Sequence, residues 1–367
     1  MDLQHLVAGI VILLGVVGCR LTPNTLQWSP KNQQAAIFVV TTDYQTGQLA
    51  RLNLEDRSAQ LQFANIHSDA VIRVFDNVPN IFIINRLGGD NIQKIDPVLG
   101  TTLQQFSVGL GQNPQDLFIR EQVAYVTALS GSDLVCLDLK SGTLLEPLDL
   151  SQFADADGSP EATFLKGHQD ELAIQLQRLD RETSFLPTDH SAIVFWDMKR
   201  NRWSGEMKLL ARNPVTDFKE SADGNWLVGE AGQVGHQSRL DGGIEKIDPR
   251  TKTSKGFITT EEQLGGDLVD FECLHEQECV AIISKPETSL VTFDPRTGTR
   301  LRTVWTSQGY HLQQVLWDSE SETLYVADSN PRDPAIRVWA SRSLIYRLDL
   351  NWKLQLPPYR MALGKRF

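Results

Sequence analysis

Apolar and polar residues alternate in short stretches along most of the chain, which is the pattern of β-strands with one buried face. The clearest stretch runs from Leu290 to Thr299, where the alternation stops at a turn and then begins again. Asp294 can accept hydrogen bonds from the following backbone amides, Pro295 presets the first turn dihedral, and Gly298 supplies the positive φ that closes a hairpin. This stretch predicts a strand, a tight turn and a second strand.

Looser copies of this unit recur along the chain. The residue that begins each turn is an Asp or an Asn, at Asn53, Asp96, Asp138, Asp197, Asp248, Asp294 and Asp349. The average spacing of these positions is about 49 residues, which lies in the range of blade-type repeats. A second predicted hairpin precedes each unit, so each repeat supplies four antiparallel strands. The sequence therefore predicts an all-β fold, a seven-bladed β-propeller of four-stranded antiparallel blades.

The ends of the predicted ring complement each other. The first repeat has three predicted strands, at 35–41, 49–54 and 59–64, and lacks an innermost strand. The lead-in of an innermost strand, 114–119, has a counterpart at 358–363. We therefore expect the C-terminal strand to complete the first blade, which removes the open edges of the ring. The propeller then spans residues 34–367.

Composition narrows the function classes. The chain has 367 residues, 41% hydrophobic residues and a net charge of −11, and no Lys-rich or Arg-rich run occurs in it. This charge argues against a nucleic-acid partner. The repeat pattern is not interrupted by a linker, so we expect one closed domain and a monomer.

The first residues have the features of a targeting segment. Residues 6–17 form an uncharged apolar run that is too short to span a bilayer and has the length of a signal-peptide core. The run ends in Val16-Val17-Gly18-Cys19, which resembles the bacterial lipobox. This resemblance implies that residues 1–18 are a lipoprotein signal peptide, that Cys19 carries the acyl chains (such as palmitate), and that residues 19–33 are a tether. Arg20 after the Cys favours the outer membrane. The alternative is a buried N-terminal strand or an uncleaved anchor.

The cysteines agree with an oxidising compartment. Cys273 and Cys279 flank a short polar segment between two predicted strands, so a hairpin would bring them within disulfide reach. The alternative is a metal pair, for which His275 is the one soft ligand nearby. Cys136 lies in an apolar strand and is expected to be an inert buried thiol.

Two segments resemble a known family. Tyr125-Val126-Thr127-Ala128 is similar to the Tyr-Val-Thr-Asn signature of YVTN-repeat propellers, and residues 325–328 are a weaker match. The similarity covers about residues 34 to 363 and includes the Asp-Pro-x-x-Gly turns. It implies the propeller fold, whereas it leaves the function open, because the family contains lactonase-like members as well as binding and surface proteins.

The long loops all fall on one face of the predicted propeller, the face that carries the links between blades and the loops between second and third strands. We call it the long-loop face. The charged residues of this face lie closest together in the acidic segment 155–161. If residues 161–166 pair with 171–176, Asp157 lies opposite Asp180. Asp155, Asp157, Glu161 and Asp180 could then bind Ca²⁺ weakly. The alternative is a solvated turn in which Arg178 and Arg181 neutralise the acids.

The histidines show no metal-ligand spacing. His236 and His311 are predicted on the long-loop face, where they could meet at the channel mouth. Together with Arg178 and Arg181 they are candidate ligand-binding residues. No Gly-x-Ser-x-Gly, Walker or Cys-x-x-Cys motif occurs.

Two functions remain. The first is a lipid-anchored envelope protein that binds a protein or small-molecule ligand through its long-loop face, with no cofactor other than Ca²⁺. The alternative is a lactonase-like hydrolase, in which His or carboxylate groups at the channel mouth activate water and Arg stabilises the oxyanion. The lack of a catalytic motif favours binding over catalysis.

Overall fold

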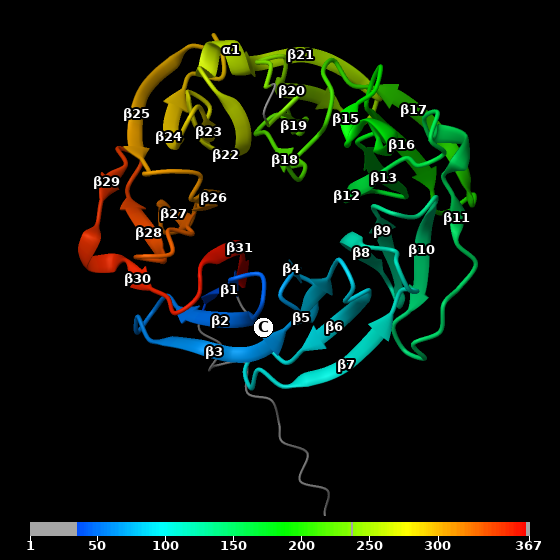
Figure 1. The fold of residues 1–367 in the computed structure, drawn as a ribbon, viewed down its shortest axis with the longest axis horizontal. Helices are drawn as coiled ribbons and strands as arrows, with labels where there is room; N and C mark the ends of the chain where they lie inside the picture. The colour runs from blue at the N-terminus through cyan, green and yellow to red at the C-terminus, as the bar shows by residue number, and fades with distance from the viewer. Residues whose placement is uncertain (1–34, 236–237, 365–367) are drawn as a thin grey trace, which may run out of the picture. The chain divides into compact units, whose positions relative to one another are not determined.

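The computed structural model describes residues 35–235 and 238–364. Their strands form seven antiparallel sheets that follow one another around a ring (Figure 1). The predicted seven-bladed β-propeller is therefore confirmed. The predicted signal peptide at 1–18, Cys19, the tether at 19–33 and His236 lie outside the described residues. No helix within the described ranges has the length and apolar character needed to cross a membrane.

The strands of each blade are given from the innermost outward. The first blade consists of β31 (Pro358–Gly364), β1 (Ala36–Thr42), β2 (Gly47–Asn53) and β3 (Ala59–Ile66). The second consists of β4 (Ala70–Phe75), β5 (Val78–Asn85), β6 (Asn91–Ile95) and β7 (Thr102–Ser107). The third consists of β8 (Pro114–Arg120), β9 (Val123–Ala128), β10 (Asp133–Asp138) and β11 (Leu148–Asp149). The fourth consists of β12 (Ala162–His168), β13 (Glu171–Leu176), β16 (Ala192–Asp197) and β17 (Arg202–Lys208).

The remaining three blades follow the same order. The fifth consists of β18 (Lys219–Glu220), β19 (Trp226–Glu230), β20 (Gly243–Asp248) and β21 (Thr253–Thr260). The sixth consists of β22 (Asp267–His275), β23 (Glu278–Ser284), β24 (Thr288–Phe293) and β25 (Arg300–Thr306). The seventh consists of β26 (Leu312–Asp318), β27 (Thr323–Asp328) and β28 (Ala335–Ala340), with β29 (Ile345–Tyr346) and β30 (Trp352–Lys353) both paired to β28.

A few short elements lie between these strands. A small hairpin of β14 (Leu179–Asp180) and β15 (Leu186–Pro187) stands in the long loop of the fourth blade. The short helix α1 (Glu261–Leu264) links the fifth and sixth blades, and 3-10 turns occur at Ser151–Phe153, Arg181–Thr183 and Leu348–Leu350.

The recurrent turns use the chemistry that the sequence indicated. Asp294 Oδ1 accepts a hydrogen bond from the Arg296 amide at 2.9 Å, and Gly298 has a φ of 72°. The Arg296 side chain beside Asp294 lowers the pKa of that carboxyl to about 2. The same bond to the amide two residues on forms at five other turns, at Asn53, Asp96, Asp138, Asp197 and Asp248. These local bonds fix the hairpin between third and fourth strands.

The turn predicted at Asp349 is wrong. The third strand of the seventh blade is β28, and the turn after it closes through the Leu344 amide, which donates to the Ser341 carbonyl at 3.0 Å. Asp349 lies instead in a 3-10 turn, where its carboxylate is 2.7 Å from Arg347. The sequence pattern assigned β28 to a loop, because the turn that follows this strand contains no Asp or Gly.

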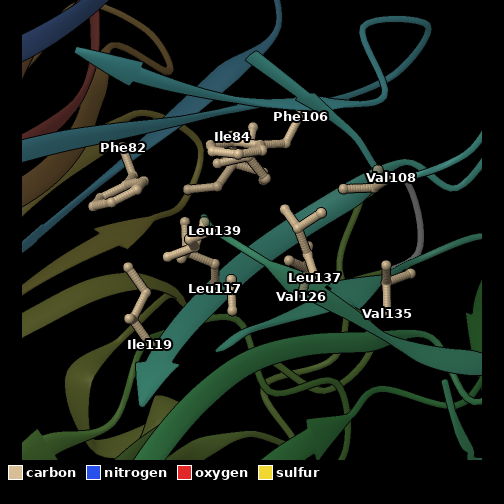
Figure 2. Packing of buried hydrophobic residues seen from close by; sticks show 12 residues of the cluster. Phe82, Ile84, Phe106, Val108, Leu117, Ile119, Val126, Val135, Leu137 and Leu139 are labelled. Atoms are coloured by element: carbon tan, nitrogen blue, oxygen red, sulfur yellow. The ribbon is translucent and has the colours of Figure 1, made fainter. Parts of the chain in front are cut away.

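The hydrophobic core lies mainly between neighbouring blades. Figure 2 shows the cluster between the second and third blades, where Phe82 and Ile84 of β5 and Phe106 of β7 pack near Leu117 and Ile119 of β8. Similar clusters join the other blades. Each sheet therefore buries both faces against its neighbours and depends on them for most of its stability.

The ring closes through the C-terminal strand, as predicted. β31 pairs with β1 in an antiparallel register that sets Leu363 opposite Ile37 and Met361 opposite Val39. Figure 1 shows red β31 beside blue β1. The Thr42 amide extends the ladder by donating to the Pro357 carbonyl at 2.8 Å. No blade is left with an open inner edge at this junction.

The structure joins Cys273 and Cys279 in a disulfide with an S–S distance of 2.02 Å. The two residues are direct partners in the β22–β23 ladder. Cys136 is buried in β10, and burial raises the pKa of its thiol to about 11. A thiol with so little thiolate is unreactive at neutral pH.

Truncation before Pro358 tests the closure. Removing β31 exposes the inner edge of β1 and uncovers Ile37 and Val39, so we expect loss of the cooperative melting transition and a tendency to aggregate. Melting followed by circular dichroism and light scattering measures both. Removal of residues 365–367 is the control and should leave the transition almost unchanged. Equal melting temperatures for full-length and truncated chains would contradict the closure.

Candidate functional site in the central channel

The innermost strands surround a cavity of about 460 Å³ on the axis of the propeller. All seven blades contribute side chains to its wall. Arg86, Leu129 and Gln177 come from loops between second and third strands, so the cavity reaches the long-loop face. A polar cavity where several elements converge is the usual place for a ligand site.

Four innermost strands contain an irregularity at the same level. The pairing with the second strand shifts just before Asp116 in β8, Asp270 in β22, Gln314 in β26 and Arg360 in β31. A bulge adds one unpaired residue and re-aims the side chains beside it. All four residues line the cavity, so the bulges place a set of polar groups around the axis.

Three of these residues tie their blade to the next one. Asp116 Oδ2 accepts from the Leu165 amide of β12 at 2.8 Å. Asp270 Oδ2 accepts from the Val315 amide of β26 at 3.0 Å. Gln314 Oε1 accepts from the backbone amide of β31. Arg360, at the equivalent position of the first blade, is a donor and cannot make this bond.

An ion-pair network crosses the cavity. Arg73 of β4 donates to Asp116 in the neighbouring third blade and to Asp217, which precedes β18 in the fifth blade. Burial works against the charge on Arg73, but the two carboxylates raise its pKa well above the ordinary value. Burial alone would raise the pKa of Asp217, yet Arg73 holds it below its usual range. Burial raises the pKa of Asp116, and Arg73 offsets part of that rise. The network fixes three blades relative to each other.

A second ion pair joins the fifth blade to the sixth. Lys219 Nζ is 2.6 Å from Glu272, and the carboxylates of Glu272 and Asp270 raise the pKa of Lys219 above its usual value despite burial. Burial raises the pKa of Asp270, and Lys219 and Arg360 offset part of that rise. The positive charges of Lys219 and Arg360 act on Asp270, but Asp270 makes no ion pair within 4.0 Å among the described residues.

The acidic segment on the long-loop face forms a compact cluster. Oxygens of Asp155, Asp157 and Glu161 all lie within 4.8 Å of one another, and Asp155 Oδ2 is buried without a hydrogen-bond partner in the described part of the chain. Arg181 lies beside the cluster, with Nε 3.0 Å from Glu161 and its amide 2.9 Å from Asp157. The cluster therefore already has one cation close by.

The strand register that we predicted for this segment is wrong. Lys166 pairs with Ala173 instead of Glu171, a shift of two residues, and beyond a bulge in β12 Leu176 pairs with Ala162 instead of Glu161, a shift of one. Asp157 consequently faces the Arg181 amide instead of Asp180. Asp180 is not part of the cluster; its carboxylate caps a 3-10 turn by accepting from the Glu182 amide.

Of the predicted ligand-binding residues that the structure describes, Arg178, Arg181 and His311 do not line the cavity. Arg178 contacts His190 and lies 3.7 Å from Asp189, within its own loop. His311 makes backbone bonds to Thr288 and Ser329 near the channel mouth. Sequence reasoning missed the residues that do line the cavity, above all Asp116 and Arg360. The matching lead-ins 114–117 and 358–361 could have pointed to them.

A buried pair of carboxyl groups lies in the fifth blade. Glu230 of β19 and Glu245 of β20 are fully buried neighbours, and Oε1 of each has no hydrogen-bond partner in the described part of the chain. One oxygen of each accepts a backbone amide, from Ala211 at 2.6 Å and from Leu210 at 2.9 Å. Burial and the neighbouring carboxyl raise the pKa of Glu230 well above its usual value. The folded chain therefore favours the protonated form of Glu230 more than the unfolded chain does.

The fold and the cavity define the chain as a seven-bladed β-propeller with a polar axial cavity. No protein-family model and no curated protein matches the chain. Among solved structures, it is similar to a 6-phosphogluconolactonase-like protein of Bacteroides fragilis, with a TM-score of 0.64 and 13% identity over 92% of this chain and 99% of that one.

Two further solved structures share the fold. A quinonprotein alcohol dehydrogenase-like protein of Bacteroides thetaiotaomicron has a TM-score of 0.61 and 12% identity over 90% of this chain and 78% of that one. AztD of Citrobacter koseri has a TM-score of 0.56 and 12% identity over 91% of this chain and 100% of that one. Likeness at this level of identity shows the fold alone.

We predict that millimolar Ca²⁺ raises the melting temperature through the cluster of Asp155, Asp157 and Glu161. A cation relieves the repulsion between the carboxylates, and at ten times its Kd it adds about 1.4 kcal/mol to the free energy of unfolding. Calorimetry with calcium and with chelator measures the shift, which Asp155→Asn should abolish and Asp180→Asn should preserve. Identical curves for the wild type would mean that Arg181 alone compensates the charges.

The Glu230–Glu245 pair predicts that stability falls as pH rises. The unfolded chain releases the Glu230 proton above about pH 4.5, whereas the folded chain retains it, so unfolding becomes easier by up to about 1.4 kcal/mol per pH unit until the folded pKa is reached. Glu230→Gln mimics the protonated form. We expect its melting temperature to match the wild type near pH 4.5 and to exceed it at pH 8. A constant difference between the two proteins from pH 4.5 to 8 would contradict the raised pKa of Glu230.

Proposed function

We propose that the protein is a binding protein of the cell envelope that takes a small ligand into the axial cavity from its long-loop face. The observation that carries this proposal is the wall of the cavity. It contains charged and polar groups from all seven blades, held in place by ion pairs and by bonds between blades. Such a preorganised polar wall lowers the cost of ordering side chains on binding.

The composition of the wall supports binding over covalent catalysis. Among the described residues, no His, Cys or Ser lines the cavity. The charge of Arg73 is balanced by Asp116 and Asp217, and that of Lys219 by Glu272. A nucleophile activated by a neighbouring base, the arrangement that acyl transfer needs, is not formed by these residues.

A channel-filling variant tests the proposal. Val215 lines the cavity and belongs to none of the hydrophobic clusters, so Val215→Trp should fill the cavity and leave the core intact. Wild-type protein is incubated with a small-molecule extract and separated by size, and the retained compounds are identified by mass spectrometry. We expect at least one compound that the wild type retains and Val215→Trp does not. Equal retention by the two proteins would refute a site in the cavity.

A lactonase-like hydrolase is the second candidate, and Asp270 favours it. Burial raises the pKa of this carboxyl, as a general base that works near neutral pH requires, and the cavity also holds Arg360. Hydrolysis of D-glucono-1,5-lactone above its spontaneous rate, lost in Asp270→Asn, would establish this activity. The fold likeness to a 6-phosphogluconolactonase-like protein and the resemblance to YVTN-repeat propellers support the choice of substrate.

The envelope location rests on the segment that ends in Cys19. We predict that Cys19→Ser moves the protein from the membrane fraction to the soluble fraction, because the thiol is the acylated atom. Fractionation and incorporation of labelled palmitate measure the change. The variant Cys136→Ser is the matched control and should stay with the membrane. Palmitate that still incorporates into Cys19→Ser would exclude acylation at this residue.

A further inference from the structure

Arg360 differs from the other cations that line the cavity. Arg73 is paired with Asp116 and Asp217, Arg86 with Asp69, and Lys219 with Glu272. The structure gives Arg360 no carboxylate within 4.0 Å in the ranges that it describes. Its one set of hydrogen bonds uses Nη1, which donates to the Gln313 carbonyl at 3.1 Å and the Tyr359 carbonyl at 3.3 Å. Nε and Nη2 are left to a ligand.

The guanidinium of Arg360 is held in a fixed position. Its central carbon lies 4.4 Å from the centre of the Tyr359 ring, and the two carbonyl bonds hold its other side. Arg86 donates to the Tyr359 hydroxyl at 3.1 Å. The positive charge of Arg360, and to a smaller extent that of Arg86, lowers the pKa of Tyr359, although burial acts in the opposite direction. The electrostatic potential at the Tyr359 hydroxyl is therefore positive. A fixed guanidinium with free donors is suited to a carboxylate.

Asp270 occupies the same level of the cavity on another strand. It follows the bulge in β22 as Arg360 follows the bulge in β31. The charge of Arg360 acts on Asp270, although the two groups do not form an ion pair. Asp270 uses Oδ2 for the Val315 amide and, as a carboxylate, keeps further acceptor sites. A ligand anion at Arg360 can therefore offer a hydroxyl to Asp270.

The remaining charges set limits on the ligand. Arg360 is the one cation of the cavity wall without a carboxylate within 4.0 Å among the described residues, so one positive charge faces the ligand. A single charge matches a carboxylate better than a dianionic group such as phosphate. A cationic ligand is repelled by the guanidinium of Arg360. Apolar side chains such as Val215 and Leu316 also line the cavity, where they can contact a short carbon chain of the ligand.

We propose that Arg360 and Asp270 form a binding site for a small hydroxycarboxylate, in which Arg360 holds the carboxylate and Asp270 accepts from a hydroxyl. This inference rests on the proposed function, because it names the ligand class of the same cavity. It assigns to the first blade a role that its neighbours do not share: the position that ties other blades together holds the ligand here.

Titration calorimetry on the full chain tests the inference, with D-gluconate as the probe. Sorbitol has the hydroxyls without the carboxylate, and inorganic phosphate has the charge without the carbon chain. We expect gluconate to bind and both of the others to bind at least tenfold more weakly. Phosphate that binds as tightly as gluconate would overturn the hydroxycarboxylate assignment.

Variants locate the site. Arg360→Gln should weaken gluconate binding at least tenfold, and Asp270→Asn should reduce the preference for gluconate over lactate, which has fewer hydroxyls. The matched control is Arg332→Gln, since Arg332 is exposed on the long-loop face and does not line the cavity. If Arg360→Gln fails to fold, Arg360→Lys retains the charge and should bind with an intermediate affinity.

Two outcomes would refute the inference. Equal gluconate affinities for Arg360→Gln and Arg332→Gln would show that Arg360 does not hold the carboxylate. Absence of gluconate and lactate binding to the wild type would exclude the ligand class. In either case, retention of another compound by the wild type and its loss in Val215→Trp would leave the proposed function standing, so the two failures are distinguishable.

Discussion

The antiparallel pairing of β31 with β1 is the interaction on which the rest of the structure depends. The blades bury most of their apolar side chains against each other, so the hydrophobic stabilisation of each blade depends on an unbroken ring. The pairing joins residues more than three hundred positions apart, as in Val39 and Met361. It also delivers Arg360 to the cavity. One strand therefore completes both the core of the first blade and the wall of the candidate site.

The channel shows how a repeated backbone produces a site that is not symmetrical. A bulge recurs at one level of β8, β22, β26 and β31, and it presents one polar side chain per blade to the axis. Where that side chain is an acceptor, it binds the next blade. Where it is Arg360, it faces the cavity with free donors. The repeat provides the position, and the residue at that position decides whether the side chain accepts from the next blade, as Asp116 does, or directs donors into the cavity, as Arg360 does.

Contacts between residues close together in the sequence could be predicted, whereas contacts between residues of different blades could not. The turn at Asp294 could be predicted because an Asp accepts from the amide two residues on, an interaction contained in three consecutive residues. β28 was missed because its turn, at 341–344, contains neither Asp nor Gly. Asp157 faces the Arg181 amide and not Asp180, because the β12–β13 hairpin has another register than predicted and β12 contains a bulge, and neither leaves a clear mark in an alternating pattern. Asp270 and Arg360 line the same cavity only because the blades close into a ring, so no spacing in the sequence indicates that they share a site.

The order of synthesis follows from the place of β31 in the chain. The ribosome makes this strand after the other strands of all seven blades, and until then β1 has no inner partner. A nascent chain can assemble the middle blades but lacks both the closed ring and the guanidinium of Arg360. The proposed binding through Arg360 therefore requires the complete closing strand, and a ligand bound in this way would select finished molecules over chains that end early.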